Sequence, residues 1–393
     1  MDLLIDKFNF LCKERNLILI QQFITNNPDF DISANNEYAF CNVCENGHLE
    51  VAQWLYQIKP TIDISIDDEY AFCRACENGH LEVAKWLYRI KPTIENEYAF
   101  CKACENNHLE VSQWLYQIKP TIDISIDDEY AFCKACENGH LEVAKWLYGI
   151  KHTIDISIED EYAFCSSCEN GYLEVAQWLY QIKPTIDISI NGEYAFCNAC
   201  KNGHLEVAQW LYGIKPTIDI SIEDEYAFRR ACENEHLEVA QWLYQIKPTI
   251  DISVKNEWVF RGICDRGHLE VAQWLYEIKP TIDISAENDW AFRGACDKGH
   301  LQVAQWLCTL NPSYHNKITT YYIDKSLPID NIKTILMSEI YNERKECSVC
   351  YEGVSIQTNC SHNFCESCIS KHYSNSKLCP YCRETIIMCY RIV

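Results

Sequence analysis

A tryptophan recurs every 32 residues through most of this chain, and this period constrains the fold more than any other feature. One interval is 28 residues, because the segment 93–97 lacks four residues of the usual spacer. The tryptophans are Trp54, Trp86, Trp114, Trp146, Trp178, Trp210, Trp242, Trp274 and Trp306. A degenerate copy comes first, in which Phe8 and Cys12 lie one period before Phe40 and Cys44. A fixed period of this length predicts a solenoid, in which each unit packs on its neighbours.

Each repeat is predicted to contain two helices and a connector. Acidic residues are expected at the start of the first helix, where the helix dipole favours negative charge, with Asp68 as the N-cap. Apolar residues at helical spacing predict helices over residues 69–78 and 81–90, with Gly79 in the left-handed conformation between them. A Lys-Pro pair ends the second helix, and residues 61–66 are expected to form an extended connector.

Several repeated side chains look like sites of chemistry but favour structural roles. Cys41 and Cys44, like the pair in each of the next five repeats, have the spacing of half a zinc site. That spacing falls within a helix, and the first cysteine becomes arginine in the last three repeats, so we expect buried or half-buried thiols. The repeated histidine becomes Tyr172 in one copy, which favours packing or capping. The tryptophans are expected in the core, and the acidic clusters as solvated caps. No active site is predicted in the array.

The second helix resembles that of a known family. Ankyrin repeats carry a second-helix signature that is similar to residues 79–87, Gly-His-Leu-Glu-Val-Ala-Lys-Trp-Leu. The first helix departs from that family, because residues 70–73 read Tyr-Ala-Phe-Cys instead of Thr-Pro-Leu-His. The near-identical copies resemble the ankyrin-type repeats that are abundant in giant DNA viruses. The resemblance implies nine repeats over residues 35–310, preceded by a degenerate capping repeat over residues 1–34.

One position varies between repeats while its neighbours stay nearly constant. It is the second residue after the phenylalanine of each first helix, and it runs Asn42, Arg74, Lys102, Lys134, Ser166, Asn198, Arg230, Gly262 and Gly294. Variable positions in a packed repeat are expected to be exposed. In ankyrin arrays the first helix and the loops line the concave binding face, so the resemblance implies that this position recognises a protein partner. The candidates are Asn42, Arg74, Lys102, Lys134 and Arg230. Unselected surface drift is the alternative.

Eight metal-binding side chains occur in four closely spaced pairs near the C-terminus. They are Cys347, Cys350, Cys360, His362, Cys365, Cys368, Cys379 and Cys382. A two-residue gap lets a tight turn direct both sulfurs at one ion, and zinc accepts four thiolates or three thiolates and one imidazole. Eight ligands suffice for two Zn²⁺ ions, and closed four-ligand sites make the metal structural. A disulfide cluster or a run of buried thiols is the alternative.

The order of these ligands resembles the RING finger, in which the pairs interleave. The resemblance implies that the first and third pairs hold one zinc ion, and the second and fourth pairs hold the other. It also implies an apolar surface for a ubiquitin-conjugating enzyme at Val349, Ile369 and Pro380. Arg383 matches the cation that bridges this enzyme and ubiquitin. His372 stands where the family has tryptophan.

A segment at residues 311–343 joins the array to the expected RING finger at residues 344–387. Apolar residues recur there at helical spacing from residue 330 to residue 341, so we expect a short helix that covers the last repeat. A RING dimerisation helix is the alternative, and it would make the chain a homodimer.

Formal charge is uneven along the chain, which carries −23 in total. Residues 311–393 contain nine basic and eight acidic residues, so residues 1–310 carry −24. Such an acidic array repels phosphate backbones and anionic lipids, so neither nucleic acid nor a membrane is expected as its partner. The N-terminus has no signal pattern, and no apolar run approaches the roughly 20 residues needed to span a bilayer. We therefore expect an intracellular, cytoplasmic protein, in the host cytoplasm if it is viral.

The two parts together predict a mainly α protein, an ankyrin-type solenoid followed by a small zinc-stabilised RING domain. We expect a RING-type ubiquitin ligase, in which the array recruits a protein substrate and the RING binds a ubiquitin-conjugating enzyme and promotes ubiquitin transfer. No catalytic residue is expected on the chain, because a RING acts by positioning its partners. A non-enzymatic adaptor, whose RING only dimerises or docks, is the alternative.

Overall fold

The computed structural model describes residues 2–94, 97–314, 356–358, 363–364 and 389–391, and the chain divides into two compact units, 1–222 and 223–393. The helices of the first unit are α1 (Asp2–Lys13), α2 (Leu17–Asn26), α3 (Ala34–Glu45), α4 (Leu49–Ile58), α5 (Ile66–Glu77), α6 (Leu81–Ile90), α7 (Glu97–Glu105), α8 (Leu109–Ile118), α9 (Ile126–Glu137), α10 (Leu141–Ile150), α11 (Ile158–Glu169), α12 (Leu173–Ile182), α13 (Ile190–Lys201) and α14 (Leu205–Ile214). Those of the second unit, which begins within the first turn of α15, are α15 (Ile222–Glu233), α16 (Leu237–Ile246), α17 (Val254–Arg266), α18 (Leu269–Ile278), α19 (Ala286–Asp297) and α20 (Leu301–Leu310).

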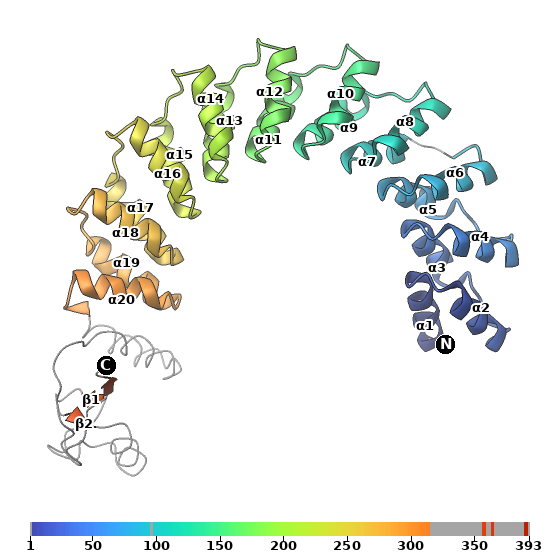
Figure 1. Ribbon diagram of the computed structural model, residues 1–393, viewed down its shortest axis with the longest axis horizontal. Helices are drawn as coiled ribbons and strands as arrows, with labels where there is room; N and C mark the ends of the chain where they lie inside the picture. Colours follow the sequence, from blue (N-terminus) through green and yellow to red (C-terminus); the bar gives the residue numbers. More distant parts are fainter. Residues whose placement is uncertain (1, 95–96, 315–355, 359–362, 365–388, 392–393) are drawn as a thin grey trace. The chain divides into compact units, whose positions relative to one another are not determined.

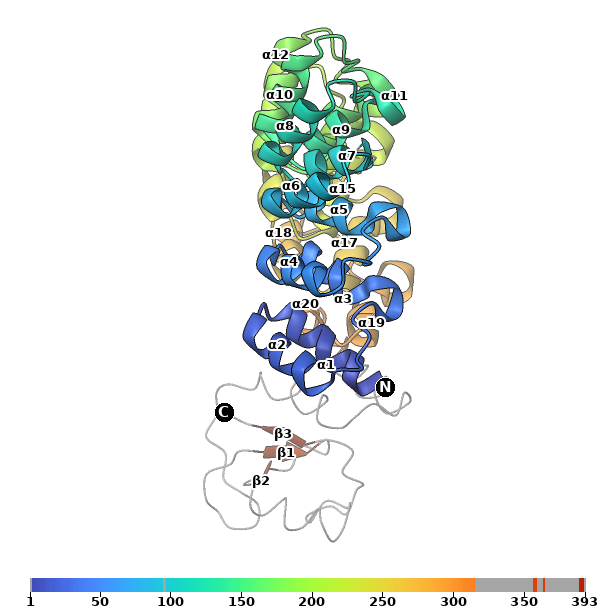
Figure 2. The ribbon, with the colours of Figure 1, turned by 90° about the vertical axis from the view of Figure 1, so that its right-hand side faces the viewer.

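Helices of the first unit stand in two columns. Each repeat contributes one odd-numbered and one even-numbered helix, and the columns are separate in the side view of Figure 2. Successive odd-numbered helices pack directly against each other, as α9 does against α11 and α11 against α13. The odd-numbered helices lie on the inner side of the curve that this unit makes in Figure 1. The predicted helical-repeat solenoid is therefore confirmed.

The core of each repeat consists of the side chains that the sequence places there. Phe72, Ala75 and Cys76 of α5 are fully buried, and so is Leu87 of α6. Burying a phenylalanine or leucine side chain stabilises the fold by about 1.5–3 kcal/mol. The same buried positions recur in the other repeats. The degenerate first copy follows this pattern, with Phe8 and Cys12 buried on α1 and Phe23 on α2.

The first helix of each repeat begins differently from the expectation. α5 starts at Ile66, and Asp67 and Glu69 have φ values of 49° and 58°. Three consecutive residues at this place are left-handed in later repeats, as in α11. At the start of an ordinary helix, the N-cap residue has an extended backbone, and the residues that follow it are right-handed. The prediction that a right-handed helix starts at Glu69 is therefore wrong, while the side chain of Asp68 lies outside the described part of the structure.

The last glutamate of most acidic clusters is buried rather than solvated, although Glu69 and Glu97 are half-buried. The hydroxyl of Ser157 donates to both carboxylate oxygens of Glu161, at 2.8 Å each. Glu129 accepts the hydroxyl of Ser125 at 2.9 Å and the backbone N–H of Asp155, in the next repeat, at 3.4 Å. These hydrogen bonds offset the cost of the left-handed turn, which is about 1–2 kcal/mol per residue other than glycine. The prediction of a solvated cap is wrong for this glutamate.

Connectors between repeats are turns rather than extended segments. The backbone N–H of Ile62 donates to the Lys59 carbonyl at 3.1 Å, and that of Ile66 donates to the Asp63 carbonyl at 3.3 Å. Ile62 and Ile64 are buried beneath these turns. The connector therefore adds apolar side chains to the core, which an extended surface segment would not do.

The described part of the C-terminal region forms a small antiparallel sheet with the strand order β2–β1–β3. Its strands are β1 (Ile356–Thr358), β2 (Asn363–Phe364) and β3 (Cys389–Arg391). Ile356 lies opposite both Phe364 and Arg391. β3 lies beyond residue 387, where the RING finger is expected to end, and the helix expected at residues 330–341 lies outside the described residues. None of the described helices is both long enough and apolar enough to cross a lipid bilayer.

Candidate functional site

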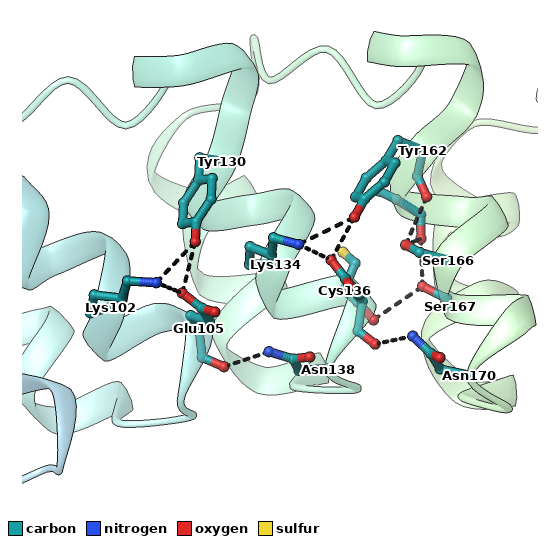
Figure 3. A network of polar contacts seen from close by, with 12 residues as sticks. Lys102, Glu105, Tyr130, Lys134, Cys136, Asn138, Tyr162, Ser166, Ser167 and Asn170 are labelled. Carbon is teal, nitrogen blue, oxygen red and sulfur yellow. Dashed lines mark hydrogen bonds and ion pairs between the residues drawn. The ribbon is translucent and has the colours of Figure 1, made fainter.

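Charged and tyrosine side chains form a repeated network on the odd-numbered helices of the first unit (Figure 3). The ammonium of Lys102 lies 2.6 Å from a Glu105 carboxylate oxygen and 3.1 Å from the hydroxyl of Tyr130, in the next repeat. That hydroxyl donates to the same carboxylate oxygen at 2.9 Å. One repeat later, Lys134 pairs with Glu137 in the same way. The network therefore links the repeats that contain α7, α9 and α11 to one another.

Charge interactions in this network shift the pKa of each member. Although partial burial lowers the pKa of Lys102, its hydrogen bonds to Glu105 and Tyr130 raise it on balance above the usual range. Burial raises the pKa of Glu105, but the hydrogen bonds from Lys102 and Tyr130 lower it on balance. Burial raises the pKa of Tyr130, and the hydrogen bond to Glu105 adds to this rise. All three shifts favour Lys⁺, Glu⁻ and a neutral phenol at pH 7.

The residues predicted to recognise a partner lie on the odd-numbered helices, but they are less exposed than expected. The side chains of Lys102 and Lys134 are 20% and 26% exposed, and both form ion pairs with the glutamate three residues later. Arg74 and Arg230 are about 40% exposed and make the same ion pair, whereas Asn42 is half-buried. At the equivalent positions, Ser166 and Asn198 are buried. The prediction that this position is exposed in every repeat is therefore wrong.

The repeated histidine serves the preceding repeat, as the packing interpretation predicts. His268 lies with Nε2 3.0 Å from the Glu233 carbonyl oxygen at the end of α15. His80 makes the equivalent hydrogen bond to the backbone of Glu45. A Cβ atom added to Gly47 would lie 2.5 Å from Nδ1 of His80, so the histidine also packs on the left-handed glycine of the preceding repeat. Each ring therefore satisfies a carbonyl at a helix end.

Cysteine pairs in the array are buried thiols. Cys44 is fully buried, and Cys41 is 5% exposed. Burial raises the pKa of Cys41 to about 12, and it raises the pKa of Cys44 well above its ordinary value. A thiol in this state is neutral and a poor metal ligand or nucleophile. The interpretation of these pairs as structural thiols is confirmed.

The tryptophan ladder joins successive repeats. Trp86 packs edge-to-face on Tyr56 with ring centroids 5.9 Å apart, and it lies 6.2 Å from the ring of Phe40. Both partners belong to the preceding repeat. The predicted structural role is confirmed, although the indole is half-buried rather than enclosed in the core.

Two further tryptophans, which the sequence analysis did not single out, are exposed in the second unit. Trp258 is 41% exposed and Trp290 is 45% exposed. They replace the tyrosine that is Tyr130 in Figure 3, one residue in each of the last two repeats. The replacement of tyrosine by tryptophan at an otherwise constant position is the sequence signal that could have identified these two residues.

All eight expected zinc ligands lie outside the described residues, and so do Val349, Ile369, Pro380 and Arg383. Cys360 and His362 belong to the four residues that connect β1 to β2, which pair as a hairpin. The donor set contains seven thiols and one imidazole, which is the chemistry that structural zinc sites use.

Comparisons with known proteins agree with this arrangement. The family model described as ankyrin repeats matches three segments, residues 8–96, 72–160 and 162–256. The family model described as a ring finger domain matches residues 345–383. A search of curated proteins found no match. The chain therefore belongs to the ankyrin-repeat family and carries a RING finger near its C-terminus.

Proposed function

We propose that this protein is a RING-type ubiquitin ligase in which the repeat array recruits a protein substrate. The observation that carries the proposal is the ring finger match over the eight-ligand pattern, on the same chain as an array of a protein-binding family. The proposed organisation is a capping repeat at residues 1–34, nine repeats at 35–310, a linker at 311–343 and the RING at 344–387. We place the protein in the cytoplasm.

Two zinc ions would fold the RING segment. Cys347, Cys350, Cys365 and Cys368 would hold one ion, and Cys360, His362, Cys379 and Cys382 would hold the other. A segment of this length cannot bury enough apolar surface to fold alone, so metal binding would supply folding energy on the order of 10 kcal/mol per site. With four protein ligands on each ion, the chain's metal has a structural role.

The ligase activity would come from positioning. Val349, Ile369 and Pro380 would form the apolar contact with a ubiquitin-conjugating enzyme, and Arg383 would bridge that enzyme and ubiquitin. Holding the enzyme–ubiquitin thioester near a substrate lysine turns an encounter between separate molecules into a local reaction, so no nucleophile is needed on this chain. His372 in place of tryptophan would select which conjugating enzymes bind.

Self-ubiquitination by the purified full chain, with a panel of conjugating enzymes, tests this function. We expect Val349→Glu to reduce activity about tenfold or more, because it places a carboxylate in an apolar contact. Arg383→Ala should also reduce activity, while Arg391→Ala is the matched control and should not. Zinc content is measured in each variant. None of these substitutions removes a proposed ligand, so unchanged zinc content would show that the RING remains folded.

The opposite outcome supports the adaptor. A wild-type chain that holds two zinc ions per molecule but transfers no ubiquitin with any conjugating enzyme contradicts the ligase proposal. Equal activity in wild type, Val349→Glu and Arg383→Ala contradicts the proposed contact surface.

A further inference from the structure

The last two repeats lack the network that links repeats in the first unit. Gly262 and Gly294 replace the lysine or arginine, and Trp258 and Trp290 replace the tyrosine. Glycine has no side chain to bridge the repeats, and indole lacks the hydroxyl that bonds lysine and glutamate at Tyr130. Between α17 and α19, no lysine or arginine therefore stands at the position that Lys102 and Lys134 hold on α7 and α9.

A groove of about 350 Å³ lies between α17 and α19. Trp258 and Trp290 contribute exposed aromatic surface, and Lys255, Arg261 and Arg266 add positive charge. Gly262 adds no side chain to the lining, and the guanidinium of Arg266 lies 3.1 Å from where a Cβ atom on this glycine would be. Cations hold the two indoles in place. The guanidinium of Arg229 lies 4.9 Å from the Trp258 ring centroid, and that of Arg261 lies 5.9 Å from the Trp290 ring centroid. Such cation–π contacts orient the rings without covering their free edges.

The cations of this groove are only partly neutralised. Arg261 donates to the backbone carbonyls of Asn256 and Lys255, at 2.8 and 3.2 Å, and within the described residues it forms no ion pair with a carboxylate. Lys255 and Arg266 each have one ion pair, with Asp224 at 2.6 Å and Glu233 at 3.5 Å. Asp265 is the one acidic side chain among the groove's lining residues. Three cations and one carboxylate thus line the groove, within an array that carries −24.

We propose that the groove between α17 and α19 binds an acidic peptide segment of a partner protein. An aliphatic side chain of that segment would lie between Trp258 and Trp290, and its carboxylates would pair with Arg261 and the neighbouring cations. Exposed tryptophan and arginine are the side chains most enriched at the energetic centres of protein interfaces. The inference rests on the proposed function, because it names the class of substrate or partner that the array captures.

An acidic peptide is favoured over a nucleic acid by the surrounding charge. The array carries −24 over residues 1–310, which repels a long polyphosphate chain, whereas a short peptide can reach a local positive groove. A groove of about 350 Å³ also matches a few side chains rather than an extended polymer.

Fluorescence anisotropy with the full chain tests the proposal. The probe is a fluorescein-labelled octapeptide that alternates glutamate with leucine, and the comparison peptide has glutamine in place of glutamate. We expect the acidic peptide to bind more tightly, and its affinity to fall as salt rises, because salt screens the ion pairs.

Two variants restore residues that other repeats carry, so the fold should tolerate them. Trp258→Tyr with Trp290→Tyr removes the indoles, and Gly262→Lys fills the groove; each should weaken peptide binding about tenfold or more. Gly262→Lys adds positive charge, so non-specific electrostatic attraction alone would make the acidic peptide bind more tightly. Weaker binding would show that the peptide occupies the groove. Gly213→Lys, on the open surface of α14, is the matched control and should bind like wild type.

Four results would overturn the inference. These are no binding of the acidic peptide up to about 1 mM, unchanged affinity in the tyrosine variant, tighter binding of a single-stranded oligonucleotide, and a self-associated chain that the tyrosine variant dissociates. The last would assign the groove to a second copy. Self-ubiquitination by the wild-type chain is measured alongside peptide binding. Peptide binding without ligase activity would contradict the proposed function and leave the groove standing.

Discussion

Side-chain hydrogen bonds between residues one repeat apart define how this array holds together. His204 hydrogen bonds to the backbone of Glu169, and the amide of Asn202 donates to the same carbonyl at 2.8 Å. The histidine spacing is visible in the sequence, but its partner is not, because the carbonyl belongs to the backbone of another repeat. The role of the buried glutamates was also missed. A Ser-x-x-x-Glu spacing, as at Ser157 and Glu161, is the signal that could have revealed them.

The histidines predict a dependence of stability on pH. Burial lowers the pKa of His80, His108, His140 and His204, although their hydrogen bonds to backbone carbonyls oppose the shift. The unfolded state therefore binds protons more readily than the folded state, and stability should fall as pH drops below about 6.5. Thermal unfolding between pH 7.5 and pH 5.5 measures this change.

Tyrosine provides a matched control for the histidine prediction. Tyr172 occupies the histidine position in one repeat and packs against Gly139. A variant with tyrosine at the four histidine positions should lose much of the pH dependence between 7.5 and 5.5. An unchanged pH profile would mean that other groups, rather than these rings, carry it.

The turn between the two helices of a repeat sets how those helices lie relative to each other. Gly79 ends the turn after α5 with φ 77°, as its position in the sequence predicts. Asn107 and Glu235 occupy the same left-handed position, with φ 65° and 66°. Asparagine tolerates this conformation, while glutamate pays a steric cost. Glu235 is therefore strained at this turn.

Glycine at this position should stabilise the repeat. Replacement of Glu235 by glycine should raise the free energy of unfolding by about 0.5–1 kcal/mol, because glycine adopts positive φ without strain. The exposed pair of Glu235 with His268, at 3.3 Å, offsets little of this gain. Denaturant unfolding measures the difference. Asn107→Gly is the control and should change stability less; an equal effect in both variants would contradict the strain argument.

A linear array must close its ends, and the described residues show how the C-terminal repeat does so. Tyr314 is fully buried, and its ring stacks on Phe292 with centroids 4.3 Å apart. Its hydroxyl donates to Asp289 at 2.9 Å. In earlier repeats a tryptophan of the following repeat lies near this phenylalanine, so Tyr314 replaces the missing neighbour. A terminal unit needs such a cover, because each repeat is stabilised mainly by its neighbours.

Truncation of Tyr314 should destabilise the end of the array. Tyr314→Ala should cost about 3–5 kcal/mol locally, as for other large aromatic side chains removed from a core. Tyr314→Phe keeps the stack and should cost only about 1 kcal/mol, the contribution of the hydroxyl's hydrogen bond. Hydrogen exchange of α19 and α20 measures both. Protection that is equal in the alanine variant and in wild type would show that another segment covers Phe292.

Sequence periodicity alone determined the solenoid, the helix pairs and the buried faces, because nearly identical units must bury the same stripe of apolar residues against each other. The thiol assignment followed from the same pattern, whereas the ankyrin assignment rested on the resemblance of residues 79–87 to that family's second helix. Only the tertiary structure decided which of the variable positions can contact a partner and which are held by neighbouring repeats. Lys102 and Gly262 occupy equivalent positions, yet one is held by Tyr130 and the other lies in a groove beside Trp290. Their surroundings depend on side chains about 28 residues away, which become neighbours only when the repeats stack.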